Sequence, residues 1–123
     1  MGMPVLIQQN QTGTSSIWFA DWMQTPFSIS FGAIATGTPT YNIEFTLDNI
    51  DVTTGGSGQG SVSPTPNATT AANATWFQSS VSGTTTNAAG NIGSPVRALR
   101  VNVVTSSATA FVTVNFMQAT FGR

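Results

Sequence analysis

Residues Tyr41–Asp48 read YNIEFTLD and carry the most regular alternation in the chain. Every odd-numbered position in this stretch is apolar and every even-numbered position is polar. Successive side chains of a β-strand point to opposite faces, so this pattern predicts a strand with one buried and one solvated face.

The same alternation recurs along the chain, and no segment has a sustained helical period. It is clear in Phe27–Phe31, Leu99–Val103 and Ala110–Phe116, and shorter candidates are Val5–Gln9, Ile17–Ala20 and Thr75–Ser80. The stretches TGTSS, ATGTPT, TSSA and NAAGNIGSP are rich in turn-forming residues and are interpreted as turns. The sequence therefore predicts one all-β domain over residues 1–123. We expect an antiparallel, jelly-roll-like β-sandwich of about seven to eight strands.

Two segments have a different character. Residues 53–74 read TTGGSGQGSVSPTPNATTAANA, which is too poor in apolar side chains to bury a face and predicts a long flexible loop. That loop is interpreted either as a tolerated insertion or as an arm that orders against a neighbouring subunit. Residues 1–9 are expected to form an edge strand or an arm added to a neighbour's sheet.

Charge is scarce, at 6% of residues against about 25% in typical domains. A net charge of -1 without clustered basic residues argues against nucleic-acid binding. No run of about 18 apolar residues is present, so no membrane span is expected. A weakly charged surface protects poorly against association, which favours a protein that works in an assembly.

The residue types leave little room for catalysis. The chain has no histidine, cysteine or lysine, which excludes the common nucleophile–base pairs. A glycosidase could use Glu44 with Asp48 or Asp51, but a solvated strand face explains these acids more simply. Asp48 and Asp51 are too few and too irregularly spaced for an EF-hand calcium loop. We expect no catalytic residues, no metal and no cofactor.

Two arginines are candidate contacts. Arg100 shares a strand face with Asn102 and is expected to pair across strands with Glu44 or Asp48, or else to contact a partner. Arg97 lies where a strand begins, and its side chain is expected to reach out of the domain.

The aromatic residues divide between core and surface. Phe27, Ile29 and Phe31 share one face and are expected in the core. Trp18 and Phe19 are consecutive, so one should be buried and the other exposed or covered by a partner. Trp22 and Trp76 are candidate assembly contacts, because tryptophan is enriched at interfaces.

The order of several phrases resembles a known group of proteins. These phrases are DWMQTPFSISF, TGTPTYNIEFTLDNI, the WF pair at Trp76–Phe77, SPVRALRVNV and the closing VTVNFMQATFG. Together they resemble small all-β virion structural proteins of tailed bacteriophages, over most of the chain except residues 53–74. The resemblance implies a decoration, or cement, protein that binds the outer surface of the capsid and clamps neighbouring capsomers.

From this resemblance we expect a non-enzymatic protein that is made in the host cytoplasm and resides on the capsid exterior. Its expected partners are the major capsid protein and further copies of itself, as a dimer or trimer. The candidate interface residues are Val5, Leu6, Ile7, Trp18, Trp22, Trp76, Arg97 and Arg100. Two alternatives remain open: a carbohydrate-binding module of a tail fibre that uses Trp18, Trp22 or Trp76, and a tail or head-to-tail connector component.

Overall fold

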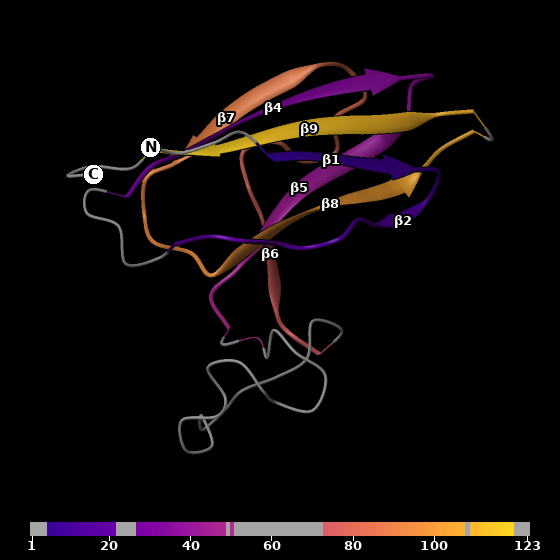
Figure 1. The fold of residues 1–123 in the computed structure, drawn as a ribbon. Helices are drawn as coiled ribbons and strands as arrows, with labels where there is room; N and C mark the ends of the chain where they lie inside the picture. The colour runs from indigo at the N-terminus through magenta and orange to yellow at the C-terminus, as the bar shows by residue number, and fades with distance from the viewer. Residues whose placement is uncertain (1–4, 22–26, 49, 51–72, 108, 120–123) are drawn as a thin grey trace.

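The computed structural model describes residues 5–21, 27–48, 50, 73–107 and 109–119, which form two antiparallel sheets packed face to face (Figure 1). Sheet A has the strand order β1-β9-β4-β7, and sheet B has the order β2-β8-β5-β6, with β3 also paired to β8. The strands are β1 (Val5–Asn10), β2 (Gly13–Thr14), β3 (Trp18–Phe19), β4 (Ile29–Thr36), β5 (Thr40–Thr46), β6 (Trp76–Gln78), β7 (Ala88–Ile92), β8 (Ala98–Thr105) and β9 (Phe111–Gln118).

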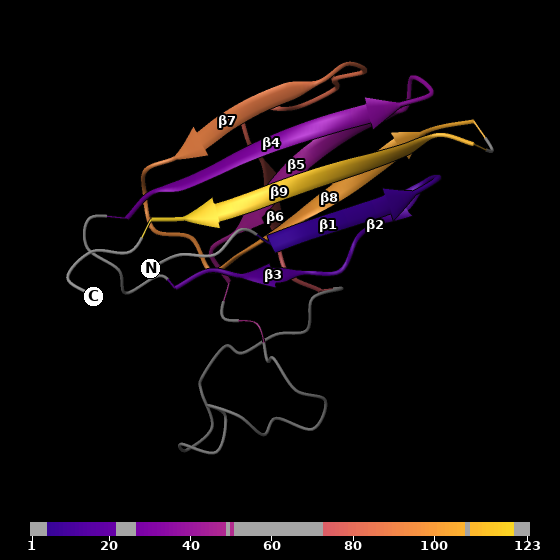
Figure 2. The same ribbon diagram turned by 45° about the horizontal axis from the view of Figure 1, so that its top comes forward.

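The pairing follows a nested scheme, in which strands from the two ends of the chain meet. Strand β1 pairs with β9, β2 and β3 pair with β8, β4 pairs with β7, and β5 pairs with β6. Successive pairs alternate between sheet A and sheet B, so the chain is a long hairpin wrapped around the core (Figure 2). This strand order is that of a jelly roll.

The predicted antiparallel sandwich is confirmed, and two details differ from the expectation. The chain between β1 and β4 forms two short strands, β2 and β3, which brings the number of strands in the described part of the chain to nine. The stretch NAAGNIGSP, predicted as a turn, contains strand β7. Its small residues lack the apolar alternation of a central strand, because β7 is an edge strand that packs few large side chains.

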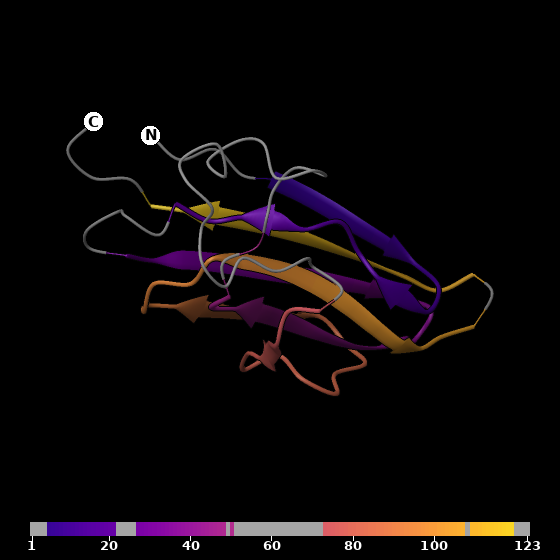
Figure 3. The same cartoon turned by 90° about the horizontal axis from the view of Figure 1, so that it is seen from below.

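The core lies between the two sheets, and Figure 3 views them from below, with strand β8 of sheet B in front. Phe116 is fully buried at its centre, and its ring stacks on Trp18 of sheet B with centroids 5.3 Å apart. The Phe31 ring also packs on Phe116, tilted by 51° with centroids 6.1 Å apart. Phe27, Ile29 and Phe31 are all buried, as the sequence predicted.

Gly90 allows β7 to approach this core closely. A Cβ atom at Gly90 would lie 2.8 Å from Cζ of Phe31 and 2.8 Å from Oγ of Ser80. These distances are shorter than van der Waals contact, so a side chain would force β7 or the Phe31 ring to move. Gly32, on the neighbouring strand β4, has nothing within 4 Å of the equivalent position.

We therefore expect Gly90→Ala to lower the free energy of unfolding by about 1–3 kcal/mol, the usual cost of overpacking. Urea unfolding followed by tryptophan fluorescence measures the change. Gly32→Ala is the matched control and should leave stability unchanged or slightly raised, because alanine restricts the unfolded chain. Equal stability of the two variants would contradict this account of Gly90.

Tyr41 is the largest fully buried side chain among the described residues and anchors β5 to the segment that precedes β7. Its hydroxyl donates a hydrogen bond of 2.6 Å to the carbonyl oxygen of Thr86, and its backbone forms a two-way bridge with Thr84. Burial raises the pKa of the Tyr41 hydroxyl above its ordinary value of 10.0, because the apolar surroundings disfavour the phenolate.

This shift predicts a loss of stability in alkali. A pKa raised by folding means that the stabilisation is complete below the unfolded-state value near 10.0 and is lost as the pH rises through the folded value. Tyr41 is the only tyrosine, so tyrosinate absorbance reports on this group alone, and unfolding curves measured over the same pH range give the change in stability. Tyr41→Phe should remove the alkaline slope. An identical slope in the variant would show that another process causes it.

Candidate functional site

The outer faces of the two sheets differ in chemistry. The four strands of sheet A contain no charged residue. Their outward positions nevertheless expose large apolar side chains: Leu6 is 62% exposed, Ile34 56% and Met117 47%. Most of the remaining outward positions are small or carry neutral polar groups, some of which hydrogen-bond to one another, as Gln8 does to Asn10 and Asn91 to Ser30. This face therefore combines apolar contact area with neutral polar groups.

A row of residues crosses the middle of this face. Leu6 on β1 is in register with Asn115 on β9, and Asn115 is in register with Gly32 on β4, which pairs with Ala89 on β7. Gly32 leaves a shallow open hollow of about 430 Å³ in the row. The hollow is lined by Gly32, Ala33, Ile34, Asn87, Ala88, Ala89 and Asn115.

Sheet B instead carries the charge on its outer face. Glu44 on β5 lies directly opposite Arg100 on β8. Oε1 of Glu44 accepts a hydrogen bond of 2.8 Å from Nε of Arg100, and Oε2 accepts one of 3.0 Å from Nδ2 of Asn102. Glu44 is only 6% exposed. The predicted cross-strand pair of Arg100 is thus confirmed, with Glu44 as its partner.

Neighbouring side chains cover this ion pair. The Trp76 ring lies over the guanidinium of Arg100, 4.2 Å from the ring centroid to Cζ, which is a cation–π contact. Beside it, Oδ1 of Asn42 accepts a hydrogen bond of 2.6 Å from the backbone amide of Gly83. The cluster holds β5, β6 and β8 together, so its polar groups are used inside the domain.

The N-terminal candidates fall on different faces. Strand β1 pairs with β9 of its own chain over all six residues. Ile7 is 7% exposed and belongs to the core, and half-buried Val5 packs against that core. Leu6 alone points outward, so the three residues do not form one contact surface.

The tryptophans are also separated. Trp18 is half-buried against Phe116, while Phe19 is 39% exposed, so these consecutive residues face opposite ways as predicted. Trp76 is half-buried over Arg100. Trp22 lies outside the described residues.

Arg97 does not extend freely from the domain, contrary to the expectation. Its Nε atom is buried, and its backbone joins two segments. Its amide donates to the carbonyl oxygen of Thr46 at 2.9 Å, and its carbonyl accepts from the amide of Ala20 at 2.9 Å. The residue closes the end of sheet B just before β8 because both of its backbone groups are paired there.

Asp48 binds the backbone of Thr75, the residue just before β6. Its Oδ2 atom accepts a hydrogen bond of 2.7 Å from the amide of Thr75, and the Thr46 hydroxyl donates to the carbonyl oxygen of Thr75 at 2.8 Å. Residues 53–72, most of the loop predicted at 53–74, lie outside the described residues, and so does Asp51.

The described acids therefore offer no assembled catalytic or metal site. Glu44 and Asp48 bind separate structural partners. No three acidic, histidine or cysteine side chains come together anywhere in the described ranges. The same ranges contain no helix of the length and apolar character needed to cross a bilayer.

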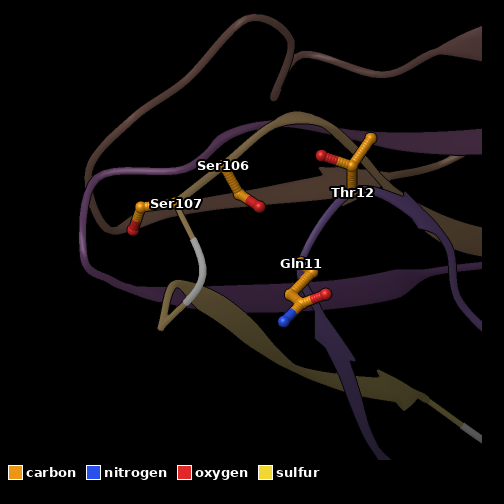
Figure 4. Close-up of a pocket in the computed structure, with 4 residues that line it drawn as sticks. All are labelled: Gln11, Thr12, Ser106 and Ser107. Atoms are coloured by element: carbon orange, nitrogen blue, oxygen red, sulfur yellow. The ribbon is translucent and has the colours of Figure 1, made fainter.

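One polar pocket lies at the end of the sandwich where the β1–β2 and β8–β9 connections meet (Figure 4). Gln11, Thr12, Ser106 and Ser107 line an open space of about 240 Å³. Its lining is neutral, and it holds no charged group that would select an ionic ligand.

Sequence reasoning missed the apolar part of the sheet A face. Ile34 and Met117 occupy the outward positions of β4 and β9, where the alternation pattern expects polar side chains. Each is an apolar residue at a position where the alternation of its strand places a solvent-facing side chain. This departure from the alternation could have indicated an exposed apolar surface from the sequence alone.

The Glu44 cluster can be tested by Glu44→Ala, which leaves Arg100 and Asn102 without their shared acceptor. We expect a loss of about 2–3 kcal/mol in the free energy of unfolding, because a largely buried guanidinium loses its counter-charge. Urea unfolding measures it.

The control is the double variant Glu44→Leu with Arg100→Leu, which removes both charges together. The double variant should lose less stability than the summed losses of the single variants Glu44→Leu and Arg100→Leu, because it leaves neither charge unpaired. Additive losses would mean that the two side chains contribute independently.

Comparison with protein-family models, curated proteins and solved structures finds no match to the chain. The functional argument therefore depends on the chemistry of the two sheet faces. Sheet B uses its charged groups internally, and sheet A presents an uncharged face with exposed apolar side chains.

Proposed function

We propose that this protein is a non-enzymatic structural component of a phage virion, a decoration protein that binds the outer surface of the capsid shell. The observation that carries the proposal is the outer face of sheet A, which exposes Leu6, Ile34 and Met117 without a single charged residue on its strands. Exposed apolar groups on an uncharged surface favour contact with another protein. The assignment to a virion comes from the sequence resemblance.

The polar cluster of sheet B supports a structural role. Its carboxylate is held by Arg100 and Asn102 at 2.8 and 3.0 Å, so it is not presented to a substrate. Trp18 and Trp76 each have one partner already, Phe116 and Arg100 respectively. A sugar platform needs an open aromatic face, so this geometry favours assembly over carbohydrate binding.

The test is quantitative mass spectrometry of purified particles of the source phage, which counts this chain relative to the major capsid protein. A decoration protein should be present at a simple ratio, about one copy per one or two capsid subunits, because it follows the symmetry of the shell.

Other results would reject the decoration role. About a dozen copies or fewer per particle would indicate a closed ring at the tail or the head-to-tail connector. Absence from the particle would remove the virion assignment altogether. Purified empty shells provide the control, because a decoration protein should bind them when added back, whereas a connector component should not.

A further inference from the structure

We propose that the outer face of sheet A binds a second copy of the same face, forming a dimer with its two-fold axis along β9. The inference rests on the proposed assembly role and deepens it by naming what binds the outer face of sheet A, which is a second copy of this chain. Its starting point is the row Leu6–Asn115–Gly32, which runs across strands β1, β9 and β4.

This row is self-complementary. Leu6 is an exposed knob on one side of Asn115, and Gly32 is a hollow on the other side, with one strand spacing of about 4.8 Å to each. Rotation by half a turn about an axis along β9 exchanges the two sides. It places Leu6 of each copy over Gly32 of the other, and it brings the two Asn115 amides together on the axis, where amides can hydrogen-bond to each other.

Gly32 itself points to close contact with another molecule. A Cβ atom at this position would meet nothing within 4 Å, so the fold of a single chain does not require glycine there. Glycine weakens a strand interior, and such a glycine often marks a place where another backbone or a ligand approaches closely. Gly90, in contrast, is explained by Phe31 within its own chain.

The charge distribution also favours a second copy. In an isologous interface every residue near the axis meets itself, so any charge there would repel its own image. The four strands of sheet A have no charge, while the charges of the described strands lie in sheet B. The face can therefore approach its own copy without charge repulsion.

The area of the face fits a weak, reversible interface. Its four strands hold 6, 8, 5 and 8 residues, and at about 3.4 Å per residue and a strand spacing of about 4.8 Å they cover about 440 Å². Two such faces bury about 900 Å², which is at the small end of protein–protein contacts and below the size of stable complexes. A contact of this size predicts a reversible dimer, with a dissociation constant in the micromolar range rather than an obligate one.

The experiment measures the dimer dissociation constant of the purified full chain by sedimentation velocity over a concentration series. Leu6→Glu places two charges in the proposed interface, and Gly32→Ile fills the hollow. Both should raise the dissociation constant at least tenfold, equivalent to about 1.4 kcal/mol. Both sites are open to solvent in the single chain, so unfolding curves should show that the variants remain folded.

Val104→Glu is the matched control. Val104 is 46% exposed on β8 of sheet B, so it adds the same charge to an exposed aliphatic position outside the proposed interface. Its dissociation constant should stay within about twofold of the wild type. A roughly tenfold rise in salt should likewise have little effect, since the interface has no charges to screen.

The inference is overturned if the wild type is monomeric at about 100 μM, well above a micromolar dissociation constant. It is also overturned if Gly32→Ile and Leu6→Glu dimerise as well as Val104→Glu. If Leu6→Glu does not fold, Gly32→Ile alone decides. If the protein is a monomer in solution and abundant on particles, the dimer is rejected and the decoration role is kept. If it is a dimer in solution and absent from particles, the decoration role is rejected and the dimer is kept.

Discussion

The two-sheet arrangement depends on one hydrophobic core that both sheets share, and the stacking of Trp18 on Phe116 is part of it. Trp18 belongs to the short strand β3 at the edge of sheet B, and Phe116 belongs to β9 in the middle of sheet A, so this aromatic pair is one of the contacts that join the sheets. Burying a phenylalanine side chain contributes about 1.5–3 kcal/mol. Nearby, the Gln118 side chain exchanges hydrogen bonds of 2.8 and 2.7 Å with the backbone of Asp21. The chain that follows β3 is thereby tied to the end of β9.

The scarcity of charge makes the use of each charged group informative. Glu44 and Arg100 neutralise each other beneath Trp76, and Asp48 binds a backbone amide where β6 begins. These groups stabilise sheet B and leave sheet A neutral. The protein consequently has one face where polar groups are satisfied internally and another where Leu6 and its neighbours remain without a partner in the single chain. Such an asymmetry is typical of a protein whose surface is completed by assembly.

Much of the fold could be predicted because alternation reports directly on burial. The central strands β5, β8 and β9 each pack one face on the core, so their patterns were clear. The strand assignment offered Glu44 and Asp48 as partners for Arg100, and the structure shows Glu44. Strand β7 was missed because Gly90, where close approach leaves no room for a side chain, and its small alanine neighbours have the composition of a turn. The sheet A face was missed because it depends on register: the row from Leu6 to Gly32 joins residues far apart in sequence, and no local pattern specifies which strands are neighbours.

The nested pairing has a consequence for how the protein folds. Sheet A needs β1 and β9, the first and last of the described strands, to meet, so its formation must close the long loop between Asn10 and Phe111. Folds dominated by such distant contacts fold slowly, on a timescale of about milliseconds to seconds. During synthesis, β1 emerges before β9 and has no partner strand until the residues from Phe111 onward have been made. Its uncharged edge is exposed to aggregation during that interval, because no charge repulsion opposes pairing with another chain.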